Sequence, residues 1–347
     1  MITINATHIG RKLDGIGRFS LYIVKHFLKK GNFKIVLNSD ALYHITSEEV
    51  ILKNKNIKIL PKILSPNKGL KAHILRLIYS NFLKGTVFNL SQLEISFWNK
   101  NQIVVVHDII PLIFPEYHRK QYFFYKKILP RILKIKTKGI IAVSNHTKKL
   151  LVELYNIPEE KIKVIYNGIE IPKLENKHKD NYILYVGRAS PTKNIERLIK
   201  AFLELKKHSK FSNLKLYLVG ANISFSHKDI FIFRSVSDKQ LDRFYRQAKI
   251  FLFPTLYEGF GYPVLEAMAR KTAVIASKVA SIPEIGGDAI CYIENPYSVG
   301  EIAEKLRYLL ENKSFREKLE EKAFKQALKF DINKTLNAYE NYLEQIN

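Results

Sequence analysis

The sequence has one cysteine and no long apolar run, so it lacks the usual features of a disulfide-bonded or a transmembrane protein. Its single cysteine, Cys291, excludes an internal disulfide and offers no cysteine cluster for zinc. No apolar run approaches the roughly 18 residues that span a bilayer, and Met1 leads into an expected strand rather than a secretion signal. We therefore expect a cytoplasmic protein without a transmembrane helix.

Acidic residues are also scarce. The chain has 57 Lys and Arg against 32 Asp and Glu, which gives a net charge of +25. Residues 1–173 hold 29 of these cations and 11 of the anions, so +18 of the charge lies in the first half. Such a balance suits an anionic partner, either a nucleic acid or a membrane surface.

Two segments of the basic half interleave Lys and Arg with aromatic and aliphatic residues, at 73–84 and 119–136. This pattern is typical of amphipathic segments on an anionic membrane, and we expect peripheral membrane contact there. The alternative is a core-facing helix with a solvated Lys face. Nucleic-acid binding is the competing class, but no helix-turn-helix, zinc or RNA-recognition pattern accompanies the charge.

The length of 347 residues exceeds what one hydrophobic core usually holds. Apolar strands alternate with helical patterns throughout, which indicates parallel α/β sheets. A polar stretch at 172–180 suggests a boundary. We therefore expect domains at 1–172 and 173–332, with a last helix at 333–347 that crosses back to the first domain.

The richest motif runs from Glu258 to Glu266, after an apolar strand at 249–254. Two glycines in this loop let a ligand approach the backbone, and Pro263 suits the first turn of the helix that follows. Glu258 lies in the loop and Glu266 about one turn into the helix, so we expect them to contact different parts of an extended ligand; a hydrolase-type pair of acid and base is the weaker alternative. The alternative is a solvated loop Glu and a Glu favoured by the helix dipole.

A second motif surrounds a βα turn after the strand at 182–186, where Arg188 and Lys193 could clamp a diphosphate. His107 follows the strand at 102–106, in the region where open α/β sheets bind ligands. A Gly-x-Gly loop at 15–17 opens an amphipathic helix. It is an incomplete dinucleotide fingerprint, because its third glycine is missing.

Together these motifs resemble the family 4 retaining glycosyltransferases, most closely the bacterial mannosyltransferases of surface-polysaccharide (lipopolysaccharide O-antigen) assembly. The resemblance implies the GT-B fold, an α/β architecture of two Rossmann-like doubly wound domains that face each other across a cleft. The N-terminal domain would bind the acceptor and the C-terminal domain the nucleotide-sugar donor. The resemblance is strong after residue 180 and looser at 40–100, which we expect to select the acceptor.

The resemblance also assigns roles to residues. In such enzymes the first Glu of the motif and the amides after it hold the donor sugar, the second Glu binds the ribose, and the Arg and Lys neutralise the diphosphate. The implied catalytic residues are His107, Glu258, Arg188 and Lys193. The implied donor-binding residues are Gly15, Gly17, Arg188, Lys193, Arg234, Glu258, Gly259, Phe260, Gly261, Tyr262 and Glu266, with Asp108 and Arg18 as acceptor-binding or orienting residues.

The expected activity is transfer of mannose from GDP-mannose to a hydroxyl of a glycan or polyprenyl-linked acceptor, at the inner face of the cell membrane. A UDP- or TDP-sugar is the alternative donor, because Arg234 stands near the expected base pocket where the family usually has Gly. A sugar-nucleotide binder without transferase activity and an epimerase are further alternatives. No Asp-x-Asp is present, so we expect neither a metal ion nor another cofactor.

Overall fold

The chain divides into two compact units in a computed structural model that describes residues 1–45, 56–174 and 178–346. Unit 1 comprises Met1–Gly168 and Ile332–Asn347, and unit 2 comprises Ile169–Asp331. The first division therefore lies four residues before the predicted boundary at 172. It lies there because the Ile169 N–H donates to the carbonyl of Phe330 (3.0 Å), which ties Ile169 to unit 2. Residues 175–177 of the predicted linker lie outside the described residues.

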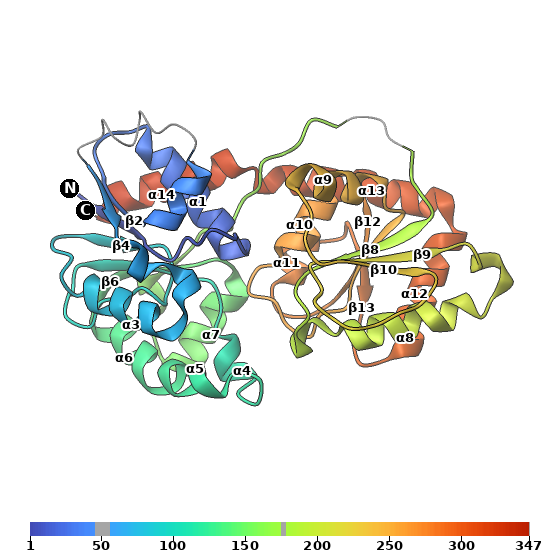
Figure 1. The fold of residues 1–347 in the computed structure, drawn as a ribbon, viewed down its shortest axis with the longest axis horizontal. Helices are drawn as coiled ribbons and strands as arrows, with labels where there is room; N and C mark the ends of the chain where they lie inside the picture. The colour runs from blue at the N-terminus through green and yellow to red at the C-terminus, as the bar shows by residue number, and fades with distance from the viewer. Residues whose placement is uncertain (46–55, 175–177, 347) are drawn as a thin grey trace. The chain divides into compact units, whose positions relative to one another are not determined.

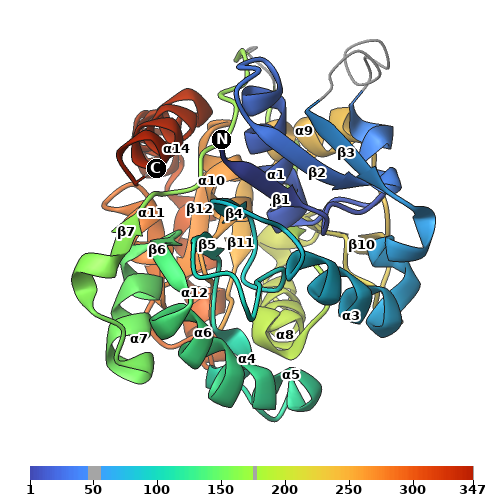
Figure 2. The same cartoon turned by 90° about the vertical axis from the view of Figure 1, so that its left-hand side faces the viewer.

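Unit 1 is built on one parallel sheet with the strand order β3-β2-β1-β4-β5-β6-β7 (Figures 1 and 2). Its apolar central strand β5 is buried along its whole length, as a strand covered on both faces requires. The strands are β1 (Thr3–Ala6), β2 (Lys34–Asn38), β3 (Ile57–Leu60), β4 (Val87–Asn89), β5 (Gln102–Val106), β6 (Thr137–Ala142) and β7 (Ile162–Val164).

The last strand of this sheet, β7, ends at Val164. The chain then leaves the sheet to meet the C-terminal segment, where the Thr335 hydroxyl donates to the carbonyl of Tyr166 (2.9 Å). That segment is α14, which packs beside α1 in unit 1 (Figure 1). Glu340 of α14 pairs with His26 (3.1 Å) and Lys30 (2.8 Å) of α1.

The helices of unit 1 cover both faces of its sheet. A single π-helical turn at Phe124–Ile128 joins α5 to α6. The helices are α1 (Gly15–Leu28), α3 (Gly69–Ser80), α4 (Ile110–Ile113), α5 (Arg119–Phe123), α6 (Leu129–Ile135), α7 (Asn145–Tyr155) and α14 (Ile332–Ile346).

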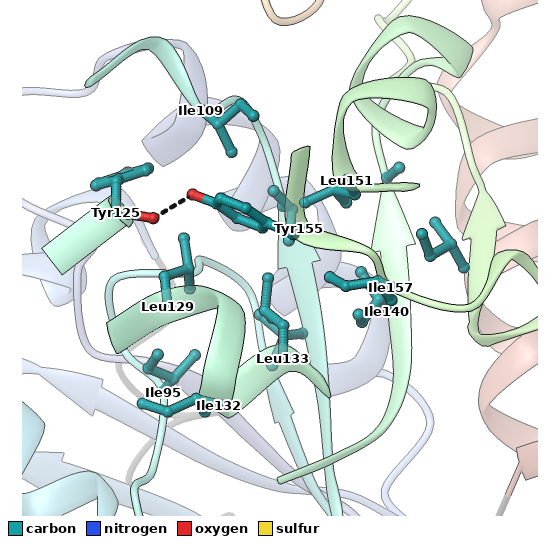
Figure 3. Close-up of a cluster of buried hydrophobic side chains, with 14 residues drawn as sticks. Ile95, Ile109, Tyr125, Leu129, Ile132, Leu133, Ile140, Leu151, Tyr155 and Ile157 are labelled. Atoms are coloured by element: carbon teal, nitrogen blue, oxygen red, sulfur yellow. Dashed lines mark hydrogen bonds between the residues drawn. The ribbon is translucent and has the colours of Figure 1, made fainter. Parts of the chain in front are cut away.

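The basic segment at 119–136 contributes one face to a hydrophobic core (Figure 3). Tyr125, Leu129 and Leu133 of this segment are buried against side chains of β5, β6 and α7. The Tyr155 hydroxyl donates to the carbonyl of Tyr125 (2.6 Å), which satisfies a buried acceptor within the π-helical turn. The apolar face of this segment therefore packs into the core, as expected from the alternative of a core-facing helix.

Unit 2 has a six-stranded parallel sheet with the order β10-β9-β8-β11-β12-β13 (Figure 1). Its strands are β8 (Tyr182–Val186), β9 (Lys215–Val219), β10 (Ile230–Phe233), β11 (Ile250–Phe253), β12 (Ala273–Ser277) and β13 (Cys291–Ile293). Its helices are α8 (Ile195–Lys206), α9 (Asp238–Gln247), α10 (Tyr262–Met268), α11 (Ile282–Gly286), α12 (Val299–Glu311) and α13 (Lys313–Ala327).

Both sheets are doubly wound, which confirms the predicted pair of Rossmann-like domains. Counted within each unit, the strands follow the order 3-2-1-4-5-6, and unit 1 adds a seventh strand. In such sheets ligands bind beyond the carboxyl ends of the strands, where the order reverses. These switch points lie between β8 and β11 in unit 2 and between β1 and β4 in unit 1.

Candidate active site

The turn after β8 carries two of the predicted residues to the switch point of unit 2. The Tyr185 hydroxyl donates to the carbonyl of Arg188 (3.3 Å), and the Arg188 side chain is exposed. A Cβ on Gly187 would lie 2.8 Å from the Tyr185 hydroxyl, so only glycine fits between them. The glycine thus lets the chain turn sharply after β8 and places Arg188 beyond the carboxyl end of this strand.

The second half of this turn is fastened to the loop after β11. Asn194 takes the left-handed conformation (φ 58°) after the 3₁₀ turn Pro191–Lys193. Its side-chain amide donates to the carbonyls of Pro254 (2.8 Å) and Pro296 (2.7 Å). Because Asn194 is buried, these hydrogen bonds fix the position of Lys193 relative to the acidic loop, the loop after β11 that carries Glu258.

The fastening brings Lys193 and Glu258 together as an ion pair. Their side chains are 21% and 11% exposed, so the pair is only partly screened by water. The Lys193 ammonium also lies 5.3 Å from the ring centre of Phe253, the last residue of β11. Two residues that the sequence placed 65 positions apart therefore meet at the switch point.

The backbone of the acidic loop is held from the other side by Ser281. Its hydroxyl lies within hydrogen-bonding distance of the carbonyls of Glu258 (2.9 Å) and Phe260 (2.8 Å). Gly261 has φ +103°, and a Cβ there would lie 2.7 Å from Ile282 Cδ1, so the turn requires glycine. Pro263 lies in the first turn of α10, as predicted.

The predicted role of Phe260 is restricted by this packing. Its ring is buried, with its centre 5.3 Å from the ring centre of Tyr262 and 6.2 Å from that of Phe330. The ring therefore belongs to the core, and Phe260 can offer a ligand only its backbone. Gly259, which the sequence also assigns to the donor, lies in the same loop before it.

Glu266 lies in α10 and is oriented by a residue that the sequence did not reveal. The buried Tyr245 hydroxyl donates to Glu266 Oε2 (2.8 Å). Arg270 lies over the Tyr245 ring at 5.4 Å, donates to the carbonyl of Glu266 (3.1 Å) and pairs with Asp242 (2.8 Å). The Glu266 carboxylate is therefore held in place before any ligand binds.

The structure does not bring Arg234 to Lys193 and Glu258. It is exposed and follows β10, which lies two strands from β8 in the sheet. The structure thus gathers Lys193 and Glu258, places Arg188 and Glu266 on the elements that flank them, and leaves Arg234 at the outer strand.

His107 lies at the carboxyl end of β5 in unit 1, where its ring is buried. Its Nε2 lies 2.8 Å from the carbonyl of Leu90. A carbonyl only accepts, so Nε2 carries the proton and Nδ1 is an acceptor. Burial lowers the pKa of His107 from 6.5 to about 4, because the charged imidazolium loses its hydration. At neutral pH this side chain is therefore an uncharged hydrogen-bond acceptor.

Gln92 fixes the backbone around His107, and no sequence motif pointed to it. Its amide oxygen accepts from the His107 N–H (3.2 Å), and its amide nitrogen donates to the Asp108 carbonyl (3.1 Å) and the Tyr125 hydroxyl (3.1 Å). The Asp108 carboxylate accepts from the N–H of Ile110 (3.1 Å) at the start of α4. Asp108 therefore anchors the turn that leads into α4.

The Gly-x-Gly sequence at 15–17, expected as a loop, is the first turn of α1, which begins at Gly15. Asp14 caps the helix by accepting from the Gly17 N–H (2.9 Å). The exposed Gly15, the buried Gly17 and the partly exposed Arg18 thus lie in the first helical turn. The next residue, Phe19, lies edge-on to His107 at 5.6 Å, which ties this turn to the end of β5.

The part of the chain that the structure describes holds neither a cluster of metal-binding side chains nor a helix that could span a membrane. Among residues 1–45, 56–174 and 178–346, no group of three or more His, Cys, Asp or Glu is arranged to hold a metal ion. No helix in the same part of the chain is long and apolar enough to cross a membrane.

Comparison with known families decides the class of this site. The family described as Glycosyltransferase Family 4 matches residues 13–172, and the family described as Glycosyl transferases group 1 matches residues 168–326. The O-antigen chain mannosyltransferase B of Escherichia coli is 30% identical over 270 residues, which cover 68% of this chain and 69% of the relative. The chain belongs to glycosyltransferase family 4.

Another relative of this glycosyltransferase is the O-antigen chain mannosyltransferase RfbU of Salmonella typhimurium. It is 31% identical over 208 residues, which cover 57% of each chain. The match thus spans little more than half of that relative.

Solved structures share the GT-B fold of the glycosyltransferase. A glycosyltransferase from Rickettsia africae superposes with a TM-score of 0.68 at 19% identity, and covers 99% of this chain and 98% of its own. HepE from Anabaena, solved with UDP-glucose, gives a TM-score of 0.75 at 16% identity over 99% of both chains. At these identities the likeness shows the fold alone.

Proposed function

We propose that the glycosyltransferase moves mannose from GDP-mannose to a hydroxyl of a glycan or polyprenyl-linked acceptor in surface-polysaccharide assembly, with retention at the anomeric carbon. The observation that carries this proposal is the meeting of Lys193 and Glu258 at the switch point of unit 2, between Arg188 and Glu266. The mannosyl donor is supported by the two O-antigen mannosyltransferases among the relatives. No comparison supports the nucleic-acid-binding alternative.

In this proposal the diphosphate of the donor binds Arg188 and Lys193, while Glu258 accepts hydrogen bonds from the sugar and Glu266 from the ribose. Lys193 exchanges its carboxylate partner for a phosphate oxygen, and this exchange frees Glu258 for the sugar hydroxyls. His107, as an uncharged acceptor, receives a hydrogen bond from a sugar hydroxyl rather than stabilising a phosphate. Unit 2 thus supplies the contacts to the nucleotide and its diphosphate.

Cleavage of the bond between the sugar C1 and the diphosphate oxygen places negative charge on the departing diphosphate. Fixed cations bind that charge more strongly in the transition state than in the ground state, and each such group can contribute about 3 kcal/mol. A phosphate oxygen takes the proton of the acceptor hydroxyl while the acceptor oxygen bonds to C1 on the same face. The reaction then needs neither an attacking carboxylate nor, in this proposal, a metal ion.

A thermal-shift panel of GDP, UDP, TDP and ADP without metal tests the donor. A nucleotide at 100 times its dissociation constant stabilises the folded state by about 2.7 kcal/mol. We expect GDP to raise the melting midpoint and the effect to be lost in Arg188→Ala and Glu266→Ala. Preference for another base would replace the mannosyl donor and keep the enzyme class. The absence of any response would contradict the nucleotide-sugar site.

We further propose that the protein acts at the inner face of the cell membrane as a peripheral protein. The motivating observation is the exposed cationic face of the segment at 119–136, whose apolar side lies in the core. Charge reversal of four of its exposed cations should abolish binding to anionic liposomes, and unchanged binding would contradict this surface. The four residues to reverse are Lys126, Lys127, Arg131 and Lys134.

A further inference from the structure

The solvent-facing side of α3 is apolar, while its core-facing side is polar. Ile74, Leu75 and Ile78 are exposed, and Ile78 is 50% exposed. The buried row four residues apart is Ala72, Arg76 and Ser80, so two of its three members are polar. This arrangement inverts the usual pattern of a surface helix, so the exposed isoleucines need a physical explanation beyond the fold of unit 1.

A loop adds the only tryptophan of the chain to this face. Trp98 is 68% exposed and lies edge-on to Phe82, itself 65% exposed, with ring centres 6.2 Å apart. The loop is fixed in place, because Asn81 Oδ1 accepts from the N–H groups of Phe97 (2.7 Å) and Trp98 (3.2 Å). The side chain of Asn99 fastens the loop further by donating to the carbonyl of Leu83 (3.1 Å).

The exposed charges of the stretch that forms this face have one sign. Residues 56–101 contain a single acidic residue, Glu94, which is buried and paired with Arg76 (3.1 Å). The same stretch holds six exposed lysines: Lys58, Lys62, Lys68, Lys71, Lys84 and Lys100. A rigid apolar ridge among cations, with no exposed acid from its own stretch, matches the interfacial layer of an anionic bilayer.

We propose that Ile74, Ile78, Phe82 and Trp98 insert into the headgroup layer of an anionic membrane. This inference rests on the proposed peripheral membrane location, and it adds insertion of apolar side chains to the electrostatic attraction. The segment at 119–136 then contributes long-range attraction, and the α3 face contributes the apolar contact. Inserted aromatic and aliphatic side chains would hold unit 1 at the depth where a lipid-linked acceptor presents its sugar.

The sole tryptophan lets the full chain report its own insertion. We would titrate it with vesicles of phosphatidylglycerol and phosphatidylethanolamine, with and without brominated acyl chains, and record Trp98 emission. Insertion should shift the emission to the blue and allow bromine to quench it, whereas phosphatidylcholine vesicles should do neither. Bound protein with unshifted and unquenched Trp98 emission would overturn the proposal. So would an equal shift with soluble poly-glutamate, which would assign the face to an acidic protein.

Matched variants locate the contact. Ile78→Ser should weaken vesicle binding about tenfold or more, because burying an isoleucine is a large part of interfacial affinity. Ile135→Ser, in the segment at 119–136, removes an isoleucine that is even more exposed (63%) and should bind as the wild type does. The reverse order would overturn the proposal. Stabilisation by GDP, measured on both variants, reports the donor site separately, so failure of membrane insertion and failure of the transferase remain distinguishable.

Discussion

Arg76 and Glu94 form a buried ion pair whose disruption should destabilise unit 1. Their side chains are 6% and 1% exposed, and Arg76 Nε lies 3.1 Å from Glu94 Oε1. Arg76 also donates to the carbonyl of Leu64 (3.1 Å), and the Thr7 hydroxyl donates to the second Glu94 oxygen (3.0 Å). The substitution Arg76→Met keeps much of the volume but leaves a buried carboxylate without its cation.

Removing one partner of a buried pair costs about 3–5 kcal/mol. For a unit of this size each kcal/mol lowers the melting midpoint by about 2–4 °C, so Arg76→Met should lower it by roughly 10 °C. Differential scanning calorimetry would measure the change. The double variant Arg76→Met with Glu94→Gln should recover part of the loss, because the remaining amide carries no charge.

The loss should also depend on pH. Burial raises the pKa of Glu94 above its ordinary value of 4.5, although the nearby Arg76 charge opposes this shift. The penalty for an ionised, unpaired Glu94 is thus absent below pH 4.5 and grows as the pH rises through the raised pKa. Arg76→Met should therefore lose more stability at pH 8 than at pH 5. Equal losses at both pH values, or no recovery in the double variant, would refute the reasoning.

Three further predictions concern other parts of the chain. Because the pKa of His107 is lowered, the free energy of unfolding falls as the pH drops from 6.5 to about 4. His107→Gln should reduce this loss, measured by denaturant titration, by about 3 kcal/mol. Tyr245→Phe should weaken GDP binding about tenfold by calorimetry, because Glu266 loses a hydrogen bond to its charged group, yet leave the affinity for 2′,3′-dideoxy-GDP unchanged; equal weakening of both would contradict the ribose contact. Gly139→Ala should cost about 1–3 kcal/mol in urea unfolding, because its Cβ would lie 2.6 Å from Ile346 Cδ1 of α14; an unchanged midpoint would contradict this packing.

The elements that the sequence predicted best are short apolar runs that end in glycine, proline or a polar motif. The strand at 182–186 and the turn at Gly187 follow from such local signals, as does the helix start at Pro263. The sheet order then brings the loops after β8 and β11 together. The family resemblance, rather than either motif alone, predicted that Lys193 and Glu258 belong to one site, and the structure brings their side chains together as an ion pair.

Residues that act at long range were not predictable in the same way. Tyr245 lies 21 positions before Glu266, and Gln92 lies 15 positions before His107, with no spacing that marks either pair. The inverted face of α3 was equally hidden, because its helical pattern reads as an ordinary amphipathic helix until the structure shows which side is buried. Part of the acceptor region expected at 40–100, residues 46–55, lies outside the described residues.

Cleavage of GDP-mannose in the absence of an acceptor tests the central claim most directly, because slow transfer to water needs no knowledge of the acceptor. Proton NMR of the first sugar released, before mutarotation, reports its anomeric configuration. The wild type should release the α-anomer without added metal, and this release should be lost in Lys193→Ala. Release of the β-anomer, or release that persists in Lys193→Ala, would contradict the proposed retaining transferase.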